Sequence, residues 1–94
     1  MLNAVARIDP EERIPKEMLQ NALIESGVKA ATLARRLAVD GGTVSDWKLG
    51  RLPISPSRWL AIVAAIQELS PGWAPPKWRV GDPVPPIRAK PTGN

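Results

Sequence analysis

Residues 33–47 read LARRLAVDGGTVSDW, and this stretch decides the fold. Its apolar residues recur at helical spacing in two short blocks that are separated by about three residues. The second block follows Asp40, a residue type that favours the N-cap of a helix. We therefore expect two short helices that cross at a steep angle. The residues predicted to hold this crossing are Leu33, Ala34, Leu37, Val39, Val44 and Trp47.

Two longer patterns flank this pair. A helix is expected from Pro15 to the residue before Gly27, which suits a left-handed C-cap. Another is expected over 56–69, because Ser55 is a good N-cap and Pro56 suits the first helical position. The two short helices are predicted over about 30–38 and 41–49. The sequence thus predicts an all-α domain of four to five helices over 15–70, preceded by a segment of uncertain structure, 1–14.

The last part of the chain has a different composition. Seven of the eleven prolines lie in residues 71–94, and paired prolines prevent a helix of useful length. We expect a basic tail there, extended or partly disordered. Trp73 and Trp78 are unusual in such a tail. They are interpreted as packing onto the helices or onto a second copy, and the alternative is an anchor for a partner protein.

Composition argues against an enzyme. The 94 residues include no cysteine and no histidine, so thiolate and imidazole groups are absent as nucleophiles, bases and metal ligands. Asp9, Glu11 and Glu12 form a carboxylate cluster, but without histidine we assign it no catalytic or metal-binding role. No apolar run approaches the roughly 20 residues of a membrane span. We expect a cytoplasmic binding module that uses no cofactor.

The positive charge is concentrated in two regions. Residues 29–52 hold five basic side chains against two acidic ones, and residues 71–94 hold four against one. Residues 1–28 have an acidic excess instead. A basic middle beside an acidic start favours a polyanionic partner, and ordinary solvated charges are the alternative interpretation.

Two short helices with a break of three residues form the helix-turn-helix pattern, whose second helix enters the major groove of DNA. The run from Leu33 to Arg51, with Pro53 and the RWLAI segment at 58–62, resembles the phage Cro and cI repressor family. It is most similar to the small YdaS-type branch. That branch has a Leu-Ala-x-x-Leu helix before a Thr-Val-Ser-x-Trp recognition helix, and TVSDW stands here at 43–47.

The resemblance implies a lambda-repressor-like domain and a role for each matching position. The residues expected to read base edges are Gly42, Thr43, Ser45 and Asp46. The residues expected near DNA phosphates are Arg35, Arg36, Lys48 and Arg51. The free N–H groups at the start of the third helix also favour a phosphate near Gly41. The family usually has glycine where Ala38 stands, and a longer polar side chain where Gly42 stands.

These observations lead to two functional hypotheses. The first is a sequence-specific transcriptional regulator, a repressor of the phage or mobile-element type. It would bind double-stranded DNA as a homodimer on a near-palindromic operator. The second is a protein-interaction module on the same fold, antitoxin-like or binding a polymerase or another regulator, which would bind this partner through residues 71–94. The glycine at position 42 and the acidic Asp46 motivate the second hypothesis, because neither residue is an obvious reader of DNA bases.

Overall fold

The computed structural model describes residues 13–79 and 82–87. Within these ranges the chain forms four α-helices and no strand, which confirms the all-α prediction. The helices are α1 (Lys16–Ser26), α2 (Ala30–Leu37), α3 (Gly41–Leu49) and α4 (Pro56–Leu69). Their bounds match the predicted ones within a residue at each end. The carboxylate cluster of Asp9, Glu11 and Glu12 lies outside the described residues.

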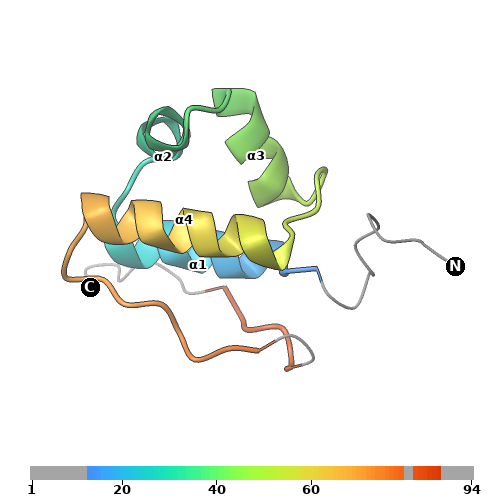
Figure 1. Ribbon diagram of the computed structural model, residues 1–94. Helices are drawn as coiled ribbons and strands as arrows, with labels where there is room; N and C mark the ends of the chain where they lie inside the picture. The colour runs from blue at the N-terminus through green and yellow to red at the C-terminus, as the bar shows by residue number, and fades with distance from the viewer. Residues whose placement is uncertain (1–12, 80–81, 88–94) are drawn as a thin grey trace, which may run out of the picture.

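The four helices form two layers (Figure 1). Helices α1 and α4 lie side by side, and the pair α2–α3 packs across them on one side. The chain after α4 returns along α1 on the opposite side. An isolated bridge joins the entry to α1 with the link before α4, because Ile14 N–H donates to the Ile54 carbonyl at 2.9 Å. The start of α1 is therefore fixed to the segment that leads into α4.

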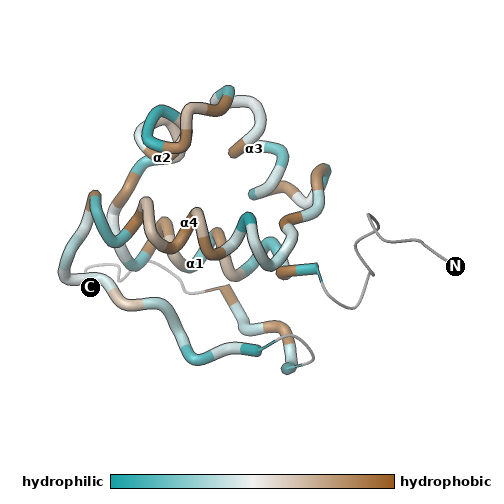
Figure 2. The backbone as a smooth tube through the Cα atoms, in the orientation of Figure 1, coloured by the Kyte–Doolittle hydropathy of each residue, from teal (hydrophilic) through white to brown (hydrophobic). Residues whose placement is uncertain are grey.

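The core lies where the two layers meet. Hydrophobic positions recur along all four helices and return in the segment after α4 (Figure 2). The predicted crossing residues form part of this core: Leu33, Ala34, Val44 and Trp47 are buried, and Leu37 and Val39 are half-buried against them. The other large side chains that are almost completely buried are Met18, Leu19, Ile54, Ile62 and Ile66. The orientation of α3 is thus set by Val44 and Trp47, which point inward.

Most helix ends follow the signals in the sequence. Gly27 and Gly50 end α1 and α3 at φ values of 75° and 79°, which favour glycine. Ser55 caps α4, since its hydroxyl accepts a hydrogen bond from Arg58 N–H at 3.1 Å. Asp40 occupies the N-cap of α3, but its side chain makes no capping hydrogen bond. Asp40 therefore stands at the predicted N-cap position, but its carboxylate does not cap the helix. The backbone carbonyl of Asp40 accepts a hydrogen bond from Thr43 N–H instead.

Helix α2 ends in an unusual way. Ala38 has φ 59° and ψ 41°, the left-handed conformation, and it is the one non-glycine residue with positive φ in the described ranges. Its N–H donates to the Arg35 carbonyl, and Val39 N–H reaches the Ala34 carbonyl at 3.0 Å. This geometry closes the three-residue turn into α3. A side chain in this conformation costs about 1–2 kcal/mol, since Cβ approaches the following carbonyl oxygen.

We expect Ala38→Gly to stabilise the domain by about 0.5–1 kcal/mol. Removal of Cβ relieves the left-handed strain, and the added entropy of the unfolded chain offsets part of this gain. Urea unfolding followed by tryptophan fluorescence measures the effect. The matched control is Ala31→Gly, at an exposed site in the same helix, which should lower stability instead. Equal losses in both variants would contradict the role assigned to Ala38.

Candidate functional site

The beginning of α3 is open to solvent. Gly41, Gly42 and Ser45 are exposed, and Thr43 is half-exposed. A Cβ added to either glycine would meet nothing within 4 Å, and neither glycine has a positive φ. Packing and backbone geometry therefore do not require glycine at 41 or 42. Because neither glycine has a side chain, the backbone of the first turn of α3 is left uncovered.

The end of α3 carries a pair of opposite charges. Arg51 Nη1 lies 3.7 Å from Asp46 Oδ1, and Arg51 N–H donates to the Asp46 carbonyl at 2.8 Å. The sequence predicted separate roles for these residues, with Asp46 reading base edges and Arg51 binding a phosphate. In the structure their side chains lie next to each other. The Arg51 side chain stays 71% exposed, and a pair this open contributes at most about 1 kcal/mol to stability. Arg51 therefore remains accessible to a ligand.

The two arginines of α2 differ in their surroundings. Arg35 is exposed. Arg36 donates from both Nε and Nη2 to Glu68 Oε1, which ties α2 to the last turn of α4. A phosphate contact by Arg36 would have to compete with this ion pair. Lys48, in the last turn of α3, is half-buried, and its carbonyl accepts a hydrogen bond from the Gln20 side chain.

Arg58 belongs to the same region, although sequence reasoning gave it no site role. Its guanidinium carbon lies 5.3 Å from the centroid of the Trp47 ring, a cation–π geometry. The residue is exposed and stands in the first turn of α4. It adds a cation beside the C-terminal half of α3. The sequence holds no local signal for this contact, because the two residues belong to different helices.

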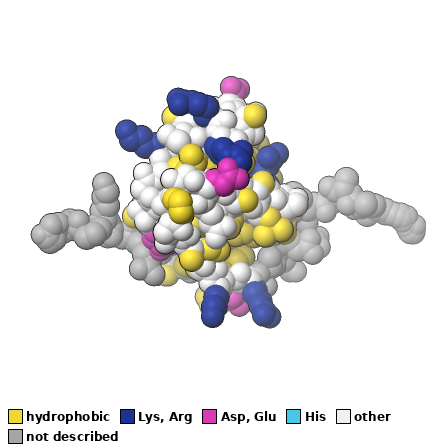
Figure 3. Space-filling view, turned by 60° about the vertical axis from the view of Figure 1, so that its left-hand side comes forward, with side chains coloured by type: hydrophobic (Ala, Val, Ile, Leu, Met, Phe, Trp, Pro, Cys, Tyr) yellow, Lys and Arg dark blue, Asp and Glu magenta, His cyan; other side chains and the backbone are white. Residues whose placement is uncertain are grey.

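Basic side chains gather at two ends of the molecule. In Figure 3, Lys and Arg surround the upper end, which is formed by α2 and α3. A second basic group lies at the lower end of the same view. Lys77 and Arg79, in the segment after α4, are exposed. Arg79 N–H also donates to Asp82 Oδ2 at 2.9 Å. The upper group lies at the end of the molecule that α2 and α3 form, and the lower group lies at the opposite end.

The segment after α4 packs against α1 without forming a helix or a strand. Trp73 is buried, and its Nε1 donates to Glu25 Oε1 at 3.2 Å. Trp78 is half-buried against the core, and its Nε1 donates to the Pro83 carbonyl. The prediction that these tryptophans pack onto the domain is confirmed. Trp73 is therefore not free to anchor a partner protein.

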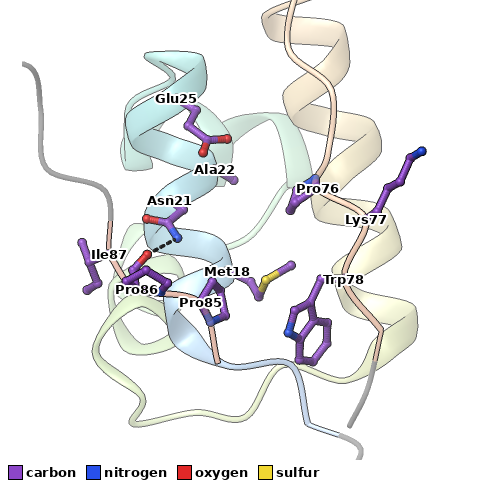
Figure 4. A pocket seen from close by; sticks show the side chains of 10 residues that line it. All are labelled: Met18, Asn21, Ala22, Glu25, Pro76, Lys77, Trp78, Pro85, Pro86 and Ile87. Carbon is purple, nitrogen blue, oxygen red and sulfur yellow. Dashed lines mark hydrogen bonds between the residues drawn. The ribbon is translucent and has the colours of Figure 1, made fainter. Parts of the chain in front are cut away.

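A pocket of about 530 Å³ lies between α1 and this segment (Figure 4). Met18 and Ala22 of α1 line it, with Trp78 on one side and Pro85 on the other. Asn21 Nδ2 donates to the Pro86 carbonyl at 2.9 Å, which fastens the segment to α1 at the edge of the pocket. The lining is mainly apolar, and its polar members are Asn21, Glu25 and Lys77.

Comparisons with protein-family models, with curated proteins and with solved structures found no match. In residues 13–79 and 82–87 there is no group of three or more acidic side chains placed to hold a metal ion. None of the described helices is both long enough and apolar enough to cross a membrane.

Truncation of Trp73 tests whether the segment after α4 belongs to the folded domain. We expect Trp73→Ala to lower the free energy of unfolding by about 3–5 kcal/mol, because it removes a buried ring and its hydrogen bond. Thermal unfolding followed by circular dichroism measures this loss. Val84→Ala, at a side chain that is 55% exposed, is the control and should be nearly neutral. A stable Trp73→Ala variant would mean that the segment is not part of the domain.

Proposed function

We propose that this protein is a DNA-binding regulator of the helix-turn-helix type, in which α3 lies in the major groove. The observation that carries the proposal is the orientation of α3. Val44 and Trp47 are buried, so Gly42 and Ser45 are turned outward in the first two turns. A helix held across a second helix by a three-residue turn, with its N-terminal turns exposed, suits insertion into that groove.

The exposed arginines around the α2–α3 pair also support DNA as the partner. Arg35, Arg51 and Arg58 are exposed around the α2–α3 pair. Such side chains bind phosphates on both sides of a groove and release counterions, so affinity falls as salt rises. The uncovered backbone at Gly41 and Gly42 allows a close approach of the DNA backbone to the start of α3.

The proposal includes modest base specificity. Gly42 offers no side chain, and Asp46 is held beside Arg51. Direct readout then depends mainly on Thr43 and Ser45, whose hydroxyl groups bond to several bases. A cytoplasmic homodimer that acts as a repressor, of the lambda-repressor-like kind, would add specificity by binding two half-sites about 34 Å apart.

Selection of bound DNA from a random-sequence pool, at two salt concentrations, tests this function. A palindromic consensus with half-sites about one helical turn apart is the expected result. Salt-sensitive binding without a consensus would restrict the function to backbone contacts. Absence of binding at low salt would overturn the proposal.

One observation favours a second candidate, a protein-interaction module. The pocket between α1 and the segment after α4 is mainly apolar and suits a hydrophobic side chain of a partner. Trp78→Ala would remove one wall of this pocket and abolish such an interaction. The same variant should leave DNA binding unchanged, since the pocket lies on the side of α1 away from α3.

Arg51→Ala should weaken binding to all DNA sequences about equally. It removes one phosphate contact, so the slope of log K against log salt should fall by about 1. Fluorescence anisotropy over a salt series measures both effects. Lys77→Ala removes the same charge at the opposite end of the molecule and should change neither quantity. A change of base preference in Arg51→Ala would contradict the assignment to phosphate.

Ser45→Ala should alter base preference and leave the salt slope unchanged. It removes a hydroxyl group from the exposed side of α3 without removing a charge. Repeating the selection with this variant shows the change at the base pairs that Ser45 contacts. An identical consensus would show that Ser45 reads no base.

A further inference from the structure

A small pocket lies where the entry to α1 meets the link between α3 and α4. Its volume is about 240 Å³, and it is lined by residues 13–16 on one side and by Trp47 and residues 50–54 on the other. The hydrogen bond from Ile14 N–H to the Ile54 carbonyl joins these two stretches. In Figure 1 they meet at the end of the molecule where both α1 and α4 begin.

Three cations line this pocket. Arg13, Lys16 and Arg51 belong to its lining, and all three are exposed. Asp46 lies 3.7 Å from Arg51, and Glu17 follows Lys16 in α1, but neither carboxylate lines the pocket. Among the described side chains, a ligand in this pocket would therefore meet three cationic groups and no anionic one.

Lys16 is placed over the pocket by contact with the end of α3. A Cβ at position 50 would lie 3.2 Å from Lys16 Cδ, so the lysine stem packs against Gly50. Gly50 also has a φ of 79°, which the turn at the end of α3 requires. The absence of a side chain at position 50 thus serves both this turn and the packing of Lys16.

We propose that this pocket binds a phosphate group of the DNA backbone, an inference that rests on the proposed function. Guanidinium groups donate paired hydrogen bonds to phosphate oxygens, and a lysine ammonium adds a compact charge. Pockets for drug-sized molecules begin at roughly 300 Å³, so a small anionic group fits here better than a whole nucleotide. Arg13 and Lys16 then bind the same phosphate as Arg51.

The surroundings of the pocket favour DNA as the source of the phosphate. Trp47 lines the pocket and also carries the Arg58 guanidinium over its ring. The pocket is therefore continuous with the exposed arginines beside the α2–α3 pair, and Arg51 belongs to both. A duplex whose major groove holds the start of α3 brings its backbone past the end of the same helix. A free phosphate ion has the same chemistry, so experiment has to separate the two sources.

Phosphate titration of the free protein tests the anion site. In amide NMR spectra, sodium phosphate should produce saturable shifts within residues 13–16 and 50–54, with a dissociation constant in the millimolar range. Sodium chloride at the same ionic strength should not produce them. Lys16→Gln should weaken phosphate binding several-fold, whereas Lys77→Gln, outside this pocket, should leave it unchanged.

Two results of this titration would overturn the proposal. The first is a set of shifts that sodium chloride reproduces. The second is phosphate binding that appears only after Glu11→Gln and Glu12→Gln. These two carboxylates directly precede Arg13 in the sequence, and that result would identify them as the occupant of the pocket.

Fluorescence anisotropy with a labelled DNA duplex of mixed sequence tests the source. Lys16→Gln should weaken DNA binding about twofold to fivefold. In the Arg51→Ala background its effect should be clearly smaller, because both residues act on one phosphate. The matched control is Arg35→Ala, on α2 and outside the pocket, which should give the same factor in both backgrounds.

The DNA measurement can also overturn the proposal. An equal factor for Lys16→Gln in both backgrounds would mean that Lys16 and Arg51 do not share a phosphate. Phosphate binding with unchanged DNA affinity in Lys16→Gln would assign the pocket to a free phosphate ion. Because the titration contains no DNA, a pocket that fails to bind phosphate is distinguished from a protein that fails to bind DNA.

Discussion

Burial of the Trp47 ring between α3 and the rest of the core is the contact on which the other features depend. Trp47 and Val44 face inward, and this orientation alone turns positions 42 and 45 outward. Arg58 covers the ring from the start of α4. Arg36 then ties α2 to the other end of the same helix through Glu68. The α2–α3 pair is thereby held to α4 at two points, so the exposed side of α3 has a fixed direction relative to the rest of the domain.

The helices themselves were predictable because their signals are local. Gly27, Gly50 and the Ser55–Pro56 pair end or begin helices through the backbone geometry of adjacent residues. Buried positions of α2 and α3 follow from helical spacing for the same reason. For the candidate site, the sequence could predict only which positions of α3 are exposed. These positions follow once the buried residues of α3 are known.

The side-chain pairings were not predictable, because no local pattern encodes them. Arg36 and Glu68 are 32 residues apart, and Trp73 and Glu25 are 48 residues apart. Asp46 and Arg51 are close in sequence, but their contact depends on how the chain leaves α3 after Gly50. The capping role expected of Asp40 failed in a similar way, since residue type indicates a preferred position and does not fix a rotamer.

The first turn of α3 lacks a capping side chain and contains two consecutive glycines. Each glycine lowers helix stability by about 1 kcal/mol relative to alanine, so local opening of this turn requires less free energy than opening of the core helices. Its amide protons should therefore exchange with solvent sooner than those around Val44 and Trp47. Any ligand that holds this turn in place must offset the conformational entropy lost on ordering it, so the binding energy is divided between recognition and local folding.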